Sequence, residues 1–158
     1  MKRAGVACIL FLAFAGLADS AYIAQHEVSG TPLLCNINNL SGCNIVATSP
    51  YSHLFGIPLA VYGVVFYGII FALAALELVI FDRLLRRFLQ GMAFIGVIAS
   101  LYFTLIQVFV IGALCVYCLA SAGIALLMMI FATVIEPVRG TAKHIPPPSR
   151  HFSMPPAS

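Results

Sequence analysis

Cys115-Val116-Tyr117-Cys118 opens an apolar run that continues to about residue 135. Two thiols with this spacing lie one helical turn apart, so they can form a disulfide in the first turn of a helix. That turn also has backbone N–H groups without intrahelical partners and the positive end of the helix dipole, and both stabilise a thiolate. The stretch therefore predicts a membrane helix that begins with a redox-active cysteine pair.

The composition of the whole chain indicates an integral membrane protein. Of 158 residues, 62% are hydrophobic and only 8% are charged, which excludes a soluble globular domain. A bilayer core of about 30 Å needs about 20 helical residues per span, so the chain has room for roughly four spans. The net charge is +3. In a membrane protein such an excess reports topology, so we expect the lipid bilayer and no nucleic acid as a partner.

Four apolar runs predict four spans, at residues about 4–24, 58–81, 88–111 and 115–135. The first run also resembles a signal peptide, and either reading leaves the next segment outside. Residues 25–53 form a polar loop, and residues 82–87 form a short basic connector. Ser49-Pro50 suits the start of a short helix over residues 51–54.

All basic residues fall on one side of the membrane if the chain crosses it four times. They precede the first span, connect the second to the third, or follow the fourth: Lys2, Arg3, Arg83, Arg86, Arg87, Arg139, Lys143 and Arg150. The positive-inside rule makes this side cytoplasmic, with both termini there and the cysteine loop extracytoplasmic, in a cell inner (plasma) membrane. Residues 137–158 are rich in proline and predict a disordered cytoplasmic tail.

The expected fold class is therefore an all-α integral membrane protein. Residues 1–136 form a four-transmembrane-helix bundle and redox domain, with an extracytoplasmic loop that carries a short helix. Cys35 and Cys43 in the loop then meet Cys115 and Cys118 at an oxidising surface, where disulfides persist. Cys8 is expected to be a small apolar filler buried in the first span.

Other uses of these cysteines stay open at this point. Cys35 and Cys43 suit a purely structural disulfide in a non-enzymatic membrane protein. A metal site at Cys115 and Cys118 could take its further ligands from the loop, as His26 or His53 with Cys35 and Cys43. The seven residues between Cys35 and Cys43 are more than the usual spacing, so we expect no metal. A third alternative is a conduit that carries thiol reducing power outward.

The cysteine motifs and the sequence between them resemble the vitamin K epoxide reductase family over residues about 16–135. They are Cys35-x7-Cys43, Ser49-Pro50-Tyr51, Phe55-Gly56-Ile57-Pro58 and Cys115-x-x-Cys118 at the start of the last span. The bacterial members are most similar. The resemblance implies a four-helix bundle around a quinone, ubiquinone or menaquinone, that receives electrons from a thioredoxin-like thiol oxidase. Many members carry that domain fused, whereas this chain ends in the proline-rich tail, so we expect a separate periplasmic partner.

The resemblance also implies a role for each cysteine. Cys118 contacts the quinone and Cys115 is its resolving partner. Cys43 exchanges with Cys115, and Cys35 exchanges with the disulfide of the partner protein through a mixed disulfide. The implied function is a membrane thiol:quinone oxidoreductase that reoxidises a disulfide-forming partner.

Several further residues are candidates for the quinone site. By resemblance, the hydroxyl of Ser49 donates to a quinone oxygen or to a thiolate. The candidates for an aromatic wall are Phe55, Tyr62, Tyr102 and Tyr117, and the alternative is that they are belt residues, because aromatic side chains are common near a membrane surface. Vertebrate members that reduce the epoxide have asparagine where this chain has Leu59 and tyrosine where it has Ala122, which favours plain quinone reduction.

Two acidic residues lie within the predicted spans. Asp19 is near the outer end of the first span and Glu77 near the inner end of the second. An acid at such a depth suggests a proton path, but we expect both side chains to reach for the nearest membrane surface.

Overall fold

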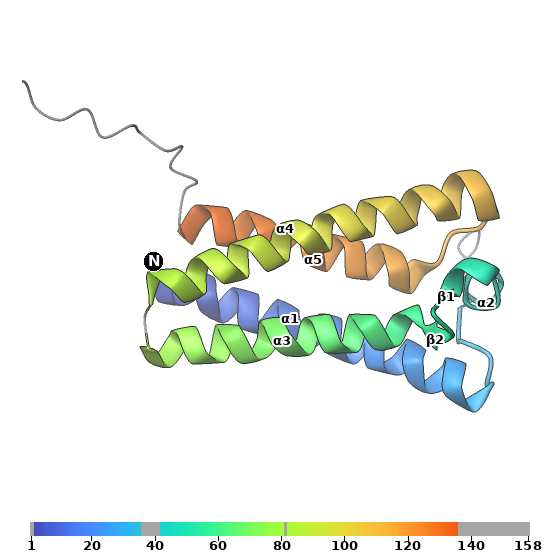
Figure 1. The fold of residues 1–158 in the computed structure, drawn as a ribbon, viewed down its shortest axis with the longest axis horizontal. Helices are drawn as coiled ribbons and strands as arrows, with labels where there is room; N and C mark the ends of the chain where they lie inside the picture. The colour runs from blue at the N-terminus through green and yellow to red at the C-terminus, as the bar shows by residue number, and fades with distance from the viewer. Residues whose placement is uncertain (1, 36–41, 81, 136–158) are drawn as a thin grey trace, which may run out of the picture.

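A computed structural model describes residues 2–35, 42–80 and 82–135 of the chain. Four long helices run side by side within these residues, as Figure 1 shows: α1 (Lys2–Ser29), α3 (Leu59–Ile80), α4 (Arg83–Ile106) and α5 (Val116–Ile135). Each helix is long and apolar enough to cross a bilayer. In the case of α4, the candidate span includes the turn that follows it and ends at Ile111. The chain is a multi-pass membrane protein, and the predicted all-α four-helix fold is confirmed.

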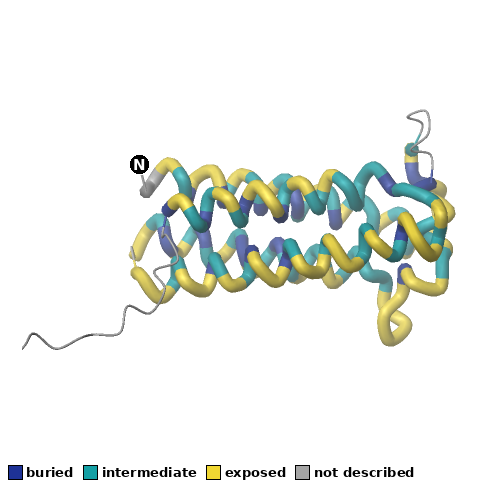
Figure 2. The backbone as a smooth tube through the Cα atoms, turned by 90° about the horizontal axis from the view of Figure 1, so that it is seen from above, coloured by how far each residue is buried: buried dark blue, intermediate teal, exposed yellow. Residues whose placement is uncertain are grey.

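The helices pack unevenly around their common core. Helix α1 packs along both α3 and α5, and α4 packs along α5, whereas α3 and α4 touch sparsely. Small residues bring α1 close to α3, because a Cβ at Gly16 would lie 2.5 Å from the Tyr67 ring. Buried residues line the inner faces of the helices, and exposed, mainly apolar residues cover the outside (Figure 2). The outer surface therefore suits contact with lipid.

The helix bounds correct two predictions. Helices α3 and α5 differ from the predicted spans by one residue at most ends, but α1 continues to Ser29, beyond residue 24. The predicted connector at residues 82–87 is wrong, because α4 already begins at Arg83. The cause is a cap: Asp82 Oδ1 accepts a hydrogen bond from the Leu84 N–H at 3.1 Å.

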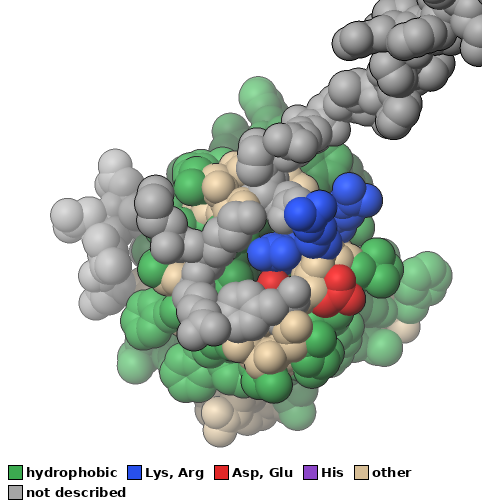
Figure 3. Space-filling view, turned by 90° about the vertical axis from the view of Figure 1, so that its left-hand side faces the viewer, with side chains coloured by type: hydrophobic (Ala, Val, Ile, Leu, Met, Phe, Trp, Pro, Cys, Tyr) green, Lys and Arg blue, Asp and Glu red, His purple; other side chains and the backbone are tan. Residues whose placement is uncertain are grey.

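The corner between α3 and α4 contains a buried ion pair. Glu77 is 0% exposed, its Oε1 lies 3.5 Å from Arg86 Nε, and its Oε2 accepts the Asp82 N–H at 3.1 Å. The expectation that Glu77 reaches the membrane surface is therefore wrong. Figure 3 shows basic side chains gathered at this end of the bundle, and those that the structure describes are Arg83, Arg86 and Arg87.

The opposite end of the bundle carries the loop that follows α1. It contains α2 (Cys43–Ala47), a 3-10 turn at Pro50–Ser52, and a hairpin of β1 (His53–Leu54) and β2 (Ile57–Pro58) (Figure 1). Phe55 and Gly56 turn the hairpin with φ of +55° and +80°. The loop carries a short helix, as predicted, and this helix is α2 at Cys43–Ala47. The one predicted at residues 51–54 is reduced to the 3-10 turn because the chain becomes extended at His53.

The predicted tail at residues 137–158 lies outside the described residues, as do Arg139, Lys143 and Arg150.

Candidate functional site

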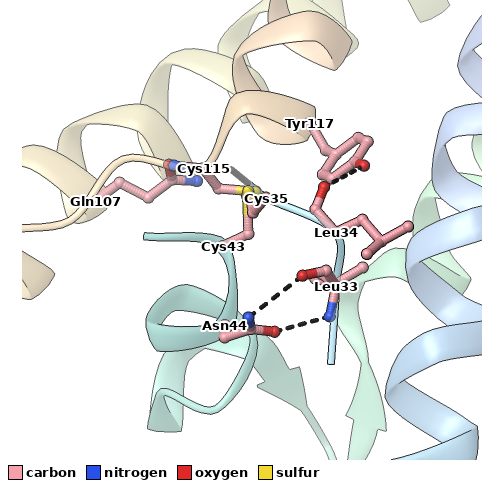
Figure 4. The surroundings of a disulfide bond; sticks show 8 residues. All are labelled: Leu33, Leu34, Cys35, Cys43, Asn44, Gln107, Cys115 and Tyr117. Atoms are coloured by element: carbon pink, nitrogen blue, oxygen red, sulfur yellow. Dashed lines mark hydrogen bonds between the residues drawn. A yellow bond between two sulfur atoms is a disulfide. The ribbon is translucent and has the colours of Figure 1, made fainter. Parts of the chain in front are cut away.

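Two segments of the loop are joined by a disulfide between Cys35 and Cys43, whose Cα atoms are 6.1 Å apart. The Asn44 side chain holds α2 against the irregular segment that follows α1, because its Oδ1 accepts the Leu33 N–H at 2.9 Å and its Nδ2 donates to the Leu33 carbonyl at 3.4 Å (Figure 4). The Tyr117 hydroxyl donates to the Leu34 carbonyl at 2.9 Å. The Tyr117 bond attaches the segment that carries Cys35 to the first turn of α5.

Cys115 lies directly before α5 and beside this disulfide (Figure 4). It is 3% exposed and belongs to one buried cluster with Leu33 and Cys43, against which Cys35 and Cys118 pack. Its carbonyl accepts the Leu119 N–H at 3.1 Å, as expected of a residue that opens a helix. The structure thus brings together the four cysteines that the sequence singled out.

The environment of Cys115 favours its thiolate. A hydrogen bond from the Cys118 thiol lowers the pKa of Cys115 to about 7, and the Cys118 and Tyr117 N–H groups assist, although burial and the negative charge of Asp19 oppose the shift. Cys115 and Cys118 are both free thiols. A reduced pair with a reactive thiolate therefore lies against an oxidised pair, which is an arrangement suited to thiol-disulfide exchange.

A cavity of about 370 Å³ opens between α1, α3, α4 and the loop, and both cysteine pairs border it through Cys43, Cys115 and Cys118. This volume is within the range of small-molecule sites. Its walls are mainly apolar side chains, among them Phe66, Ile95, Phe103 and Ile106. A flat, apolar ring with polar oxygens fits such a lining, because a few polar side chains also reach the cavity.

Two of the predicted quinone-site residues line this cavity. Ser49 does so while its Oγ donates to the Val46 carbonyl at 2.7 Å, and Ser49 makes no side-chain cap of the turn that follows. Tyr62 does so while its hydroxyl donates to the Leu54 carbonyl at 3.1 Å, which ties the hairpin to α3. Leu59 also lines the cavity.

The other aromatic candidates lie elsewhere. Phe55 is 92% exposed because it occupies the tip of the hairpin, and Tyr102 is 59% exposed on α4. Neither they nor Tyr117 nor Ala122 is among the residues that line the cavity. The structure therefore does not bring Phe55 to the cavity for which it was a candidate.

Gln107 is a site residue that the sequence reasoning missed. It begins a π-helical turn at Gln107–Ile111, is 4% exposed and lines the cavity. Its Oε1 accepts the Cys115 N–H at 3.1 Å, so this side chain positions the thiol. A single amide within an apolar run was the available signal, because a buried amide is costly unless it is hydrogen-bonded.

The remaining candidates are also located. Cys8 is exposed on the outside of α1, so its prediction as a buried filler is wrong. His26 Nδ1 pairs with Thr31 Oγ1 at 2.7 Å, and His53 Nδ1 pairs with Ser52 Oγ at 2.8 Å. Within residues 2–35, 42–80 and 82–135, no three His, Cys, Asp or Glu side chains gather as a metal site requires.

Comparison with known proteins agrees with this arrangement. The family model described as "Vitamin K epoxide reductase family" matches residues 7–133. Thiol-disulfide oxidoreductase LTO1 of Arabidopsis thaliana is 34% identical over 113 residues, which are 67% of this chain and 30% of that protein. The chain thus spans less than a third of the length of this relative. The matched family implies a quinone-type cofactor, and the chain belongs to the vitamin K epoxide reductase family.

Proposed function

We propose that this protein is a membrane thiol:quinone oxidoreductase that reoxidises a thioredoxin-like disulfide-forming partner. The observation that carries the proposal is the contact between the Cys35–Cys43 disulfide and Cys115, with Cys118 behind it in an apolar cavity. The relative named above is a thiol-disulfide oxidoreductase, which supports the same chemistry here. A quinone, ubiquinone or menaquinone, would be the electron acceptor in the cavity.

Electrons enter through the loop cysteines. In the first exchange, the dithiol of the partner reduces the Cys35–Cys43 disulfide through a mixed disulfide at Cys35. Cys43 then attacks Cys115 of an oxidised Cys115–Cys118 pair and releases Cys118. Cys35 attacks Cys43, re-forms the loop disulfide and releases Cys115, whose pKa of about 7 makes it a good leaving group.

This exchange ends in the arrangement of the structure, with the loop pair oxidised and the second pair reduced. Cys115 and Cys118 then form a disulfide and release two electrons and two protons, which a quinone in the cavity would take up. A quinone bound in the cavity would supply the two-electron acceptor, and Ser49 and Tyr62 would be among the residues that hold it, with Tyr62 also tying the hairpin to α3.

The test is quinone reduction by the purified protein with dithiothreitol as electron donor. We expect Cys115→Ala and Cys118→Ala to abolish reduction of a short-chain benzoquinone. Cys35→Ala should retain quinone binding but lose turnover with the protein partner, because that thiol forms the mixed disulfide. Cys8→Ala is the matched control, since this cysteine faces outward from α1 and should not affect either measurement.

The alternatives give different results. Full quinone reduction by Cys118→Ala would contradict the proposal. Disulfides that never turn over would favour a structural role, and four outer cysteines that are reduced in living cells would favour an outward reductant conduit. The partner can be identified by trapping, because Cys43→Ala leaves Cys35 to hold it in a mixed disulfide.

A further inference from the structure

The cavity contains two carboxyl groups that the electron path does not use. Asp19 and Glu27, both on α1, line it together with the cysteines. One oxygen of each, Oδ2 of Asp19 and Oε2 of Glu27, is buried and has no hydrogen-bond partner in the described part of the chain. Orphaned carboxylate oxygens are costly at membrane depth, and such acids usually mark ion or proton paths.

Asp19 lies within electrostatic range of the second cysteine pair. Its charge acts on Cys115, Cys118, Tyr67 and Tyr117. The nearest acid on its own helix is Glu27, and Tyr22 lies between them. Each Lys or Arg whose side chain the structure describes belongs to the far end of the bundle, so none of them neutralises Asp19 (Figure 3).

Glu27 connects this position with the loop-side surface. It follows Asp19 by eight residues, or about 12 Å along the helix at about 1.5 Å per residue. Both side chains line the cavity, and the loop residue His53 is an electrostatic neighbour of Glu27. Two carboxyl groups thus mark a route from the rim of the cavity to its cysteines.

We propose that Asp19 carries a proton between the Cys115–Cys118 pair and a quinone in the cavity, and that Glu27 links Asp19 to the loop-side surface. This inference rests on the proposed function. When Cys115 and Cys118 form their disulfide, one S–S bond forms and two electrons and two protons leave. Both electrons and both protons are taken up as the quinone becomes a hydroquinone, so the step balances without another reactant.

The need for Asp19 follows from the geometry of this transfer. The two oxygens that receive protons lie at opposite edges of a quinone ring, so one thiol cannot serve both. Asp19 gives its proton to one of them and regains a proton from the cysteine pair, whose Cys115 ionises near pH 7. Where Cys115 has already released its proton before the step, the replacement proton reaches Asp19 from the surface through Glu27, so that the quinone still receives two protons.

The decisive variant is Asp19→Asn, which keeps the shape of the side chain but cannot transfer the proton. In the full chain with dithiothreitol and a short-chain benzoquinone, we expect kcat to fall about 100-fold with KM for the benzoquinone unchanged. Asp19→Glu should restore most of the rate. A wild-type rate in Asp19→Asn overturns the proposal, and so does an Asp19→Glu variant as slow as Asp19→Asn.

A second readout does not depend on turnover. Because the charge of Asp19 raises the pKa of Cys115, the thiolate absorbance of Cys115 should titrate at lower pH in Asp19→Asn than in the wild type. An unchanged midpoint would remove the link on which the proposal depends. Glu27→Gln is the second variant, expected to slow quinone reduction without moving the midpoint, and a wild-type rate there contradicts its role. A wild-type protein that reduces no quinone would instead overturn the proposed function.

Discussion

Cys115 combines three properties at one position. It opens α5, it is held by the Gln107 side chain through its N–H, and it packs against Cys43 of the loop disulfide. The first property exposes its sulfur to helix N–H groups, and the third brings that sulfur to an exchange partner. Each would be unremarkable alone, and together they make Cys115 the point where the two cysteine pairs meet.

The pKa of Cys115 can be measured by the ultraviolet absorbance of its thiolate, taken as the difference between the wild type and Cys115→Ala. The thiolate should be lost as the pH falls through about 7, because Cys118 and two backbone N–H groups stabilise it above that pH. The rate of thiol-disulfide exchange with the loop pair should change over the same pH range. Cys118→Ala removes the main hydrogen bond, so its midpoint should move upward. A midpoint of about 8.5 in the wild type, typical of a free cysteine, would contradict this assignment.

At the scale of the element, the α3–α4 corner illustrates how a charged pair can be accommodated inside an apolar bundle. Glu77 is fully buried but has Arg86 and the Asp82 N–H as partners. Breaking a buried pair leaves one uncompensated charge, which typically costs about 3–5 kcal/mol. We therefore expect Glu77→Ala to lower the free energy of unfolding by this order, measured by circular dichroism in detergent with increasing sodium dodecyl sulfate.

Arg83→Ala is the matched control for this corner. Arg83 is exposed in the first turn of α4, so its loss should change the stability by less than about 0.5 kcal/mol. Equal stability of Glu77→Ala and the wild type would mean that the ion pair contributes nothing to the fold.

The sequence predicted the long helices well and the connections between them poorly. The apolar runs were enough to predict α3 and α5, because the side chains of a helix that crosses lipid are predominantly apolar. The start of α4 depended on the Asp82 cap, a local hydrogen bond that hydropathy does not record. Similarly, α2 is stabilised by the bonds of Asn44 to Leu33, which is eleven residues away in the sequence, so no local propensity predicted it.

The candidate site shows the same division. The four cysteines were recognisable from their spacing, whereas the roles of Phe55 and Gln107 depended on three-dimensional placement. Phe55 belongs to a matched motif, but the hairpin turns it away from the cavity. Gln107 is eight residues before Cys115, and only the π-helical turn directs its amide back to the Cys115 N–H. A sequence pattern lists possible contacts, and the backbone path selects among them.

At the scale of the whole molecule, the two ends of the bundle differ in chemistry. One end has Arg83, Arg86 and Arg87 with the buried Glu77 (Figure 3), and the other has the loop (Figure 1), with the four clustered cysteines and the cavity. We expect the arginine end to face the cytoplasm, because positively charged connections between spans are retained there. The cysteine loop would then face an oxidising compartment, which the proposed electron flow requires.

Labelling with a membrane-impermeant maleimide tests this orientation in intact cells. A variant that keeps Cys35 as its single cysteine should react from outside, because the loop pair would be extracytoplasmic. The matched control has a single cysteine introduced by Arg87→Cys at an exposed position on the opposite end, and it should react only after the membrane is permeabilised. The reverse pattern would put the loop thiols among cytosolic reductants. A disulfide at Cys35–Cys43 would not persist there, and oxidation of a partner by this route would have no driving force.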